Sequence, residues 1–187
     1  MLKKILIGIA VTLMLLAGIL AYMRSATKKH SPSAIAEYNM NAVKIEVKYC
    51  RPFKKNRIIF GDKITGALQP YGEYWRVGAN EATIFNTSTD LKIGNNSLPK
   101  GQYALYAIPE KDTWIIAFNT EYERWGATPP DTNNDVLRVE VPSIEQNYIQ
   151  EQFIITFEPN DSLINLVLNW DNVKIKLPLE PLPKAEK

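Results

Sequence analysis

The stretch Val43-Lys44-Ile45-Glu46-Val47-Lys48-Tyr49 alternates apolar and charged residues along its whole length. Because successive side chains of a β-strand point to opposite faces, the four apolar residues share one face and the three charges share the other. One buried face and one wetted face are typical of a strand in an antiparallel sheet. The stretch therefore predicts an antiparallel β fold.

Further strand-like segments follow at short intervals, each bounded by Asn, Asp, Gly or Pro. Residues 103–108 and 113–118 are apolar and aromatic, and the four turn residues between them predict a hairpin. About ten strands, with no amphipathic helix after residue 43, predict an antiparallel β-sandwich of the jelly-roll kind. The other expected strands are 58–60, 83–87, 91–93, 136–141, 153–158, 163–170 and 173–177, with at most one helical turn at 143–152.

An uncharged apolar run from Ile5 to Tyr22 follows two lysines near the N-terminus. At about 1.5 Å per residue such a helix spans roughly 27 Å, enough to cross the hydrocarbon of a bilayer. The nearest match to a signal-peptidase site, residues 19–21, begins with a bulky Ile. We therefore expect an uncleaved membrane anchor and a single-pass protein whose domain is exported to the periplasmic or cell-envelope side. The alternative is a secreted protein whose signal peptide is cleaved.

The chain divides into four segments by composition. Residues 1–23 form the anchor or signal segment, and the polar residues 24–42 form a linker. The β-sandwich domain occupies residues 43–178 and is followed by a Pro-rich tail at 179–187, which is expected to be flexible.

The charge balance of the domain argues against nucleic-acid binding. The formal charge of the whole chain is +2, but five of its 22 basic residues lie in the first thirty positions, where there is no acidic residue. From residue 31 onward 17 basic residues face 20 acidic ones, a net charge of −3. A domain with this balance has no general attraction for a phosphate backbone.

The chain has one cysteine and one histidine, which excludes several kinds of metal site and catalytic centre. Cys50 is the only cysteine, which excludes an internal disulfide and a multi-cysteine metal cluster. His30 is the only histidine and precedes the domain, which excludes a His-based nucleophilic centre or zinc site within it. We expect no cofactor and no metal site.

Residues 70–83, Pro-Tyr-Gly-Glu-Tyr-Trp-Arg-Val-Gly-Ala-Asn-Glu-Ala-Thr, gather aromatic, glycine and polar residues in one short stretch. Turn signals at residues 70–72, and a Gly78 that can take positive φ, predict a backbone bent twice. The bends are expected to bring Trp75, Arg76, Asn80 and Glu81 together. Such convergence is typical of a binding site.

A series of short motifs runs along the chain: Arg51-Pro52, Lys55, Arg57, Ile59-Phe60-Gly61, Pro70-Tyr71-Gly72, Trp75-Arg76, Gly78 to Thr83, Leu98-Pro99, Gly101 with Tyr103, Ile108-Pro109, Trp114, Asn119, Trp125-Gly126, and Asp135 with Arg138-Val139. In this order they resemble the bacterial family catalogued as domain of unknown function 2911. The resemblance extends from Ser31 to Trp170 and implies an exported all-β domain with no established activity. Two positions depart from the family pattern: Cys50 stands in place of Ser or Thr, and Asn56 stands in place of Gly.

Candidate ligand-binding residues are basic, aromatic or polar. Guanidinium groups bind carboxylate, phosphate or sulfate bidentately, and flat rings offer a stacking surface for a sugar or an aromatic ligand. The alternative is that the Arg residues pair with Glu73, Glu81 and Asp135 to hold loops against the sheets. Trp114 and Trp170 lie in strand patterns and are expected in the core. The candidates are Arg51, Arg57, Tyr71, Trp75, Arg76, Asn80, Glu81, Trp125 and Arg138.

Two acidic patterns carry weaker signals. Residues 131–135 space oxygen ligands as a calcium loop does, but the remainder of an EF-hand is missing, so a solvated turn is expected. Glu73 and Glu81 would serve glycan hydrolysis only if their carboxyl groups lie a suitable distance apart in space.

The sequence thus favours a membrane-anchored β-sandwich that binds a small polar or anionic ligand such as a carbohydrate. A carboxylate-based glycan hydrolase and a purely structural envelope module remain the alternatives.

Overall fold

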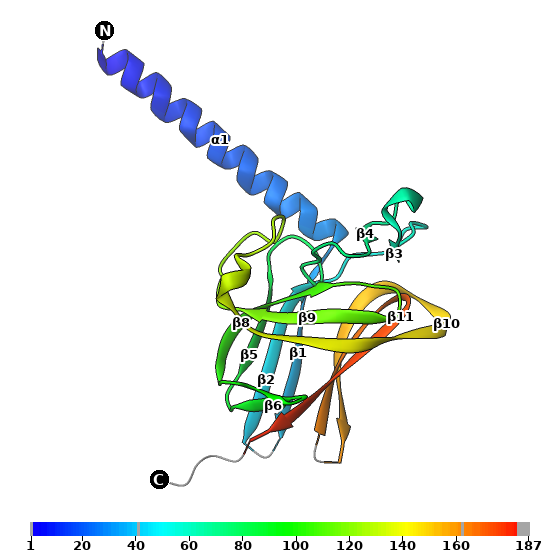
Figure 1. Ribbon diagram of the computed structural model, residues 1–187. Helices are drawn as coiled ribbons and strands as arrows, with labels where there is room; N and C mark the ends of the chain where they lie inside the picture. The colour runs from blue at the N-terminus through cyan, green and yellow to red at the C-terminus, as the bar shows by residue number, and fades with distance from the viewer. Residues whose placement is uncertain (1, 41, 162, 183–187) are drawn as a thin grey trace, which may run out of the picture.

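The computed structural model describes residues 2–40, 42–161 and 163–182 and confirms an all-β domain preceded by one helix (Figure 1). The helices are α1 (Leu2–His30) and the short 3-10 helices η1 (Lys63–Thr65) and η2 (Thr132–Asn134). The strands are β1 (Ser33–Met40), β2 (Val43–Cys50), β3 (Phe60–Gly61), β4 (Gln69–Pro70), β5 (Thr83–Thr87), β6 (Leu91–Ile93), β7 (Asn96–Leu98), β8 (Gly101–Ile108), β9 (Thr113–Asn119), β10 (Asp135–Asn160) and β11 (Leu163–Pro181).

One antiparallel sheet makes up most of the domain, in the order β1-β2-β5-β8-β9-β10-β11-β6-β7. The first part of β10 pairs with β9 and the second part pairs with β11. Between these parts β10 bends, and its register with β11 shifts twice between Glu145 and Ile154. Figure 1 shows the two long strands crossing the domain. The sheet therefore curls into two facing layers of a sandwich.

Cross-core contacts show which strands face each other. The backbone N–H of Ile155 in β10 donates to the hydroxyl of Tyr49 in β2 over 2.9 Å. The ring of Phe157 in β10 lies 6.1 Å from that of Tyr38 in β1. The second part of β10 thus covers the face of β1 and β2, and their apolar side chains meet in the core.

The strand boundaries differ from the sequence expectation in one respect. The sequence predicts separate strands at 136–141 and 153–158 with a helical turn between them, but β10 runs through all three segments. Pairing with β11 explains the continuity, because Ser143 lies opposite Ile175 and keeps this segment extended. Residues 163–170 and 173–177 likewise belong to a single strand, in which Asp171 takes a positive φ of 58°.

The centre of the core is aromatic. Trp75, Trp114 and Trp170 are each at most 2% exposed, and Phe153 is fully buried. The ring of Trp75 lies 5.6 Å from that of Trp114 and 5.9 Å from that of Trp170. Each such pair contributes about 0.5–1.5 kcal/mol beyond the apolar area it buries. Trp75 is therefore the inner anchor of residues 70–83.

The segment expected as a linker, residues 24–42, carries regular structure. α1 continues to His30, and β1 begins at Ser33 and pairs with β2. The alternation of Ala34, Ala36 and Tyr38 toward the core explains the strand; small alanines make this pattern weak in the sequence. The domain thus begins directly after the helix, and no linker separates them.

The C-terminal segment expected as a tail lies in the sheet over its first residues. β11 extends to Pro181, and the Leu179 side chain is fully buried. The backbone N–H of Leu182 donates to the carbonyl of Asp90 over 2.9 Å. The remainder of the expected tail, residues 183–187, lies outside the described residues.

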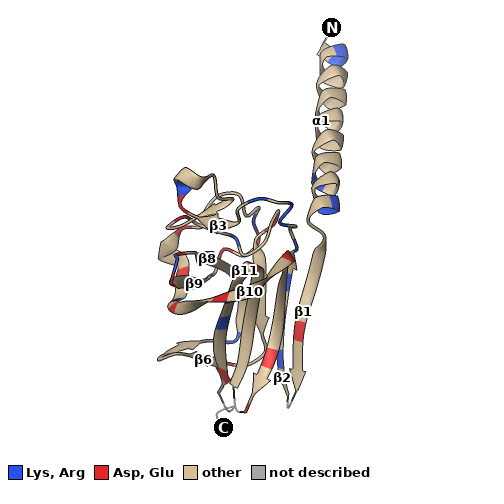
Figure 2. Cartoon of the chain, turned by 90° about the vertical axis from the view of Figure 1, so that its right-hand side faces the viewer, with Lys and Arg blue, Asp and Glu red and all other residues tan. Residues whose placement is uncertain are grey.

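α1 projects from one end of the domain, and none of its described residues is buried. By length and composition it is able to cross a membrane. Figure 2 shows basic residues in the loops beside the domain end of α1. Arg76 and Asn80 border the same pocket as His30, the last residue of α1, so part of residues 70–83 lies at the α1 end.

Candidate functional site

The backbone of residues 75–80 turns sharply after Trp75. Trp75 exchanges two backbone hydrogen bonds of 2.8 Å with Ala107, which fixes it to β8. Val77, Gly78 and Asn80 then take φ values of 51°, 144° and 64°, and the indole N–H of Trp75 donates to the carbonyl of Gly78 over 3.2 Å. Gly78 has the positive φ that the sequence predicts.

Gly78 is also required by its surroundings. A Cβ atom at this position would lie 2.8 Å from the carbonyl oxygen of Cys50 at the end of β2. The backbone of Gly78 therefore packs directly against the end of β2. Arg76 and Asn80 consequently line a pocket, whereas Glu81 faces the last turns of α1.

A pocket of about 320 Å³, here named the α1-end pocket, lies where α1 meets the domain. Its lining includes the basic residues His30, Lys55, Arg57 and Arg76. Among the described residues, no Asp or Glu lines it. The charged side chains in the lining are therefore all basic.

Arg76 is more enclosed than His30, Lys55 and Arg57, which are exposed. Its Nη1 donates to the carbonyl of Asn80 over 3.1 Å, and no carboxylate of the described chain lies within ion-pair distance of its guanidinium. Burial lowers the pKa of the Arg76 guanidinium, and nearby Tyr74 opposes this effect. Arg remains charged at neutral pH in spite of such a shift. The guanidinium is therefore a half-buried cation for which the described residues supply no anionic partner.

Trp170 borders the pocket and carries a buried donor. Its side chain is 1% exposed and forms part of the pocket lining. Its indole Nε1 has no hydrogen-bond partner in the described part of the chain. A buried unpaired N–H costs about 1–3 kcal/mol, so this group lowers the stability of the domain locally.

The remaining basic side chains are positioned by a tight turn. Lys55 and Asn56 take positive φ values of 50° and 56°. Asn tolerates this left-handed conformation better than most residues, so Asn56 adopts it where the related pattern has Gly. Arg57 folds back after the turn, and its Nε donates to the carbonyl of Lys54 over 2.9 Å.

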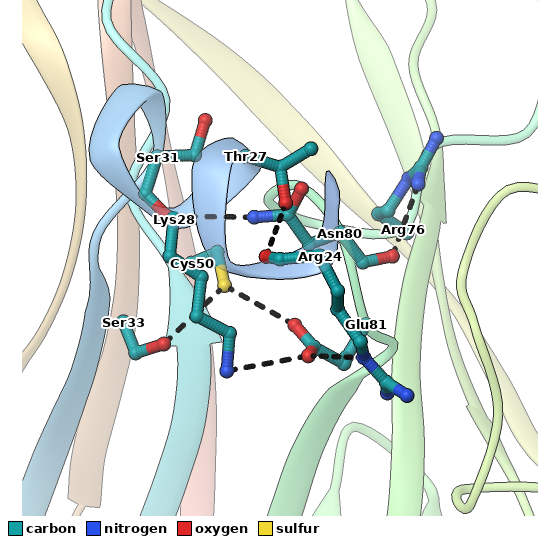
Figure 3. Close-up of polar contacts among 9 residues, drawn as sticks. All are labelled: Arg24, Thr27, Lys28, Ser31, Ser33, Cys50, Arg76, Asn80 and Glu81. Carbon is teal, nitrogen blue, oxygen red and sulfur yellow. Dashed lines mark hydrogen bonds and ion pairs between the residues drawn. The ribbon is translucent and has the colours of Figure 1, made fainter. Parts of the chain in front are cut away.

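Glu81 lies on the other side of the turn and holds α1 to the domain (Figure 3). Its carboxylate is 3.3 Å from the Lys28 ammonium and 3.4 Å from Nε of Arg24. Burial alone would raise the pKa of the Glu81 carboxyl, but a backbone hydrogen bond and these two cations hold it below the usual value. Cys50 lies beside it, with Sγ 3.7 Å from Oε2. Glu81 thus makes a structural contact and does not line the α1-end pocket.

Four other candidates lie outside the α1-end pocket. Arg51 donates from Nε to the carbonyl of Phe153 over 3.2 Å and links the end of β2 to β10. Arg138 lies 3.4 Å from Asp135 in an ion pair. Burial and surrounding carboxylates raise the pKa of Tyr71, and Trp125 is 40% exposed on the surface beside α1. With Trp75 in the core, the α1-end pocket collects only Arg57, Arg76 and Asn80 of the predicted residues.

The acidic patterns have local partners. Glu73 pairs with Lys63 over 2.8 Å, and neither it nor Glu81 lines the α1-end pocket. In the loop 131–135, Asp131 accepts a hydrogen bond from the backbone N–H of Asn133 over 3.0 Å and caps η2. Among the residues described, no group of three or more His, Cys, Asp or Glu side chains is placed to hold a metal.

The protein-family comparison matches residues 31–179 to the model described as "Protein of unknown function (DUF2911)". The chain belongs to this family. The match confirms the resemblance seen in the motifs and begins directly after α1, so the DUF2911 domain comprises most of the sheet and nearly all of the α1-end pocket. No curated protein and no solved structure shows significant similarity to the chain.

Most residues that line the α1-end pocket are not among the sequence candidates, and Trp170 and His30 are two of them. Trp170 is expected in the core, and it is buried there, but its ring also borders the pocket. His30 is assigned to a linker by composition, whereas it ends α1 at the pocket. A local sequence pattern carries no signal for either role, because both depend on how distant segments meet.

Proposed function

We propose that this protein is a membrane-anchored domain that binds a small anionic molecule in the α1-end pocket. The observation that carries the proposal is the Arg76 guanidinium, which is half-buried and has no carboxylate partner in the described chain. A cation withdrawn from water is stabilised by an opposite charge, and here that charge would come from a ligand.

The lining favours an oxyanion. Arg76 and Arg57 offer planar forks of donors that match carboxylate, phosphate or sulfate groups. The volume of about 320 Å³ lies at the lower end of the range for small-molecule sites, so the ligand is small. An acidic sugar fits both conditions.

The proposed anchor rests on α1. Its apolar stretch, residues 5–22, contains no charge, and none of the described helix is buried against the domain. The helix therefore needs another apolar environment, and a bilayer provides it. We place the domain on the exported side, in keeping with a short N-terminal tail ahead of the helix.

The geometry supports the two alternative functions, a glycan hydrolase and a structural module, less well. A glycan hydrolase needs two carboxyl groups facing one substrate, yet Glu73 and Glu81 are each paired with Lys or Arg and neither lines the pocket. A purely structural module explains the ties made by Arg51, Arg138 and Glu81. It gives no reason for the unpaired cation in the pocket.

A thermal-shift series on the full chain in detergent micelles tests the proposal. Glucuronate and glucose form a matched pair that differs in one carboxylate, and phosphate and sulfate extend the series. The melting temperature should rise with anions and not with glucose, because a ligand at 100 times its Kd stabilises the native state by about 2.7 kcal/mol.

The variant Arg76→Gln should lose the shift, while Arg138→Gln, which changes an Arg outside the pocket, should keep it. Near-ultraviolet circular dichroism verifies that both variants are folded. An anion-induced shift of equal size in folded Arg76→Gln, or no shift with any anion in the wild type, would contradict the proposal.

A further inference from the structure

A second hollow, here named the membrane-side hollow, lies between α1 and the loop that carries Trp125. Its volume is about 420 Å³, and it is lined by Leu20, Met23, Arg24 and Thr27 of α1 together with Trp125. Leu20 belongs to the apolar run of residues 5–22. Trp125 therefore lies level with the last turn of the segment proposed to cross the membrane.

The loop around Trp125 is fixed by the backbone of residues 80–82. The N–H of Gly126 donates to the carbonyl of Asn80 over 3.0 Å, and the N–H of Ala82 donates to the carbonyl of Arg124 over 3.1 Å. A Cβ atom at Gly126 would lie 2.8 Å from Cδ of Arg76, so the loop packs tightly on that side chain. The Trp125 ring is thus held at a defined place although it is 40% exposed.

The chemistry of the membrane-side hollow matches the boundary between lipid chains and headgroups. Trp is enriched at this depth because its ring is apolar and its N–H is polar. The guanidinium carbon of Arg24 lies 5.2 Å from the centre of the Trp125 ring. Leu20 and Met23 present apolar walls on the side of the membrane segment. The arrangement joins an apolar surface to a cation, as a phospholipid joins acyl chains to a phosphate.

We infer that the Trp125 loop is a second membrane contact and that the membrane-side hollow is filled by a phospholipid of the bilayer that α1 enters. The upper acyl chain lies against Leu20, Met23 and Trp125, and the phosphate lies near Arg24. This contact fixes the tilt of the domain on the membrane. The inference rests on the proposed anchoring by α1 and is independent of the ligand proposed for the α1-end pocket.

Quenching by brominated lipid tests the contact. The full chain is reconstituted into phosphatidylcholine vesicles with or without bromine atoms on the upper part of the acyl chains. Trp125 should be quenched by the brominated lipid, whereas the buried rings of Trp75, Trp114 and Trp170 should not. The quenched component should be absent from Trp125→Phe.

A matched control moves the reporter to the far end of β1. β1 begins at Ser33, near the end of α1, and finishes at Met40, which is 52% exposed. The double variant Trp125→Phe/Met40→Trp therefore places the exposed Trp ring at the end of β1 that is farther from α1. This variant should show no quenching by brominated lipid. Equal quenching in the control and the wild type would overturn the inference.

Alkaline extraction separates this inference from the anchor. If the protein stays in the membrane fraction but brominated lipid quenches wild type and Trp125→Phe equally, the Trp125 contact is wrong and the anchor stands. If alkali releases the protein from the vesicles, the anchor and the contact are both wrong. A third outcome is that brominated lipid never quenches Trp125 and that the ring becomes shielded from water only at high protein density. A second copy of the chain then occupies the hollow, which also overturns the inference.

Discussion

Replacing Gly78 with Ala should strongly destabilise the domain, although it adds a single methyl group. Gly78 has a φ of 144°, which residues with a Cβ rarely adopt. The new Cβ would also lie 2.8 Å from the carbonyl oxygen of Cys50 and 3.3 Å from Oγ1 of Thr83. The Cys50 carbonyl belongs to the last residue of β2, which is paired with Ser33 of β1. Moving it would disturb this pairing.

The two effects have separate magnitudes. A residue held in a sparsely populated backbone region costs about 1–3 kcal/mol. Adding atoms to a well-packed site costs about 1–3 kcal/mol more. The free energy of unfolding should therefore fall by about 2–6 kcal/mol, a large part of the roughly 5–15 kcal/mol that stabilises a typical domain.

Gly66→Ala provides the matched control. Gly66 also has a positive φ, 73°, but no atom lies within 4 Å of the place that an added Cβ would occupy. It should therefore show only the backbone effect, about 1–2 kcal/mol. Urea unfolding of the full chain in detergent, followed by the fluorescence of the buried Trp residues, measures both variants. A loss for Gly78→Ala no greater than that for Gly66→Ala would refute the reasoning.

Two other substitutions report on polar contacts. Tyr106→Phe removes a 2.6 Å hydrogen bond to Asp135, so the free energy of unfolding should fall by about 1–3 kcal/mol in urea titrations. Burial and Asp135 raise the pKa of Tyr106, so the unfolded state loses this proton first, and stability should fall as pH rises above about 10. Between about pH 9 and 11, the urea midpoint should fall less steeply with pH in Tyr106→Phe than in the wild type. Equal slopes would show that Tyr106 does not cause this pH dependence. Glu81→Gln should cost less than about 1 kcal/mol but speed hydrogen exchange in α1 near Arg24, and unchanged exchange would show that the ion pairs do not hold the helix.

The fold follows from local patterns because each strand of an antiparallel sheet carries its own alternation. Val43 to Tyr49 and the hairpin of β8 and β9 are found at nearly the predicted residues. The bend of β10 has no such signal, since residues 143–152 are mostly polar and exposed, and only pairing with β11 makes them a strand. β1 escapes prediction because Ala34 and Ala36 carry little hydrophobic signal.

The candidate site is less accessible to sequence reasoning. Residues 70–83 are identifiable as a bent stretch because their Gly, Pro and aromatic residues act locally. Their expected convergence is only partly correct, since the turn after Trp75 sends Arg76 and Glu81 to different surroundings. Which side each residue faces depends on where α1, β2 and the Trp125 loop pack, and these contacts join segments far apart in the chain.

Arg76 contributes both to the α1-end pocket and to the packing of the Trp125 loop. Its guanidinium carries the proposed ligand contact, while its aliphatic stem supports Gly126, next to Trp125. Replacing Arg76 with Ala would remove both the charge and the stem, so a loss of ligand binding would not distinguish a missing contact from a displaced loop. Arg76→Gln retains the first part of the stem and removes the charge. Because the stem of Arg76 supports the Trp125 loop, a test of the Arg76 charge has to use a variant that keeps part of the stem.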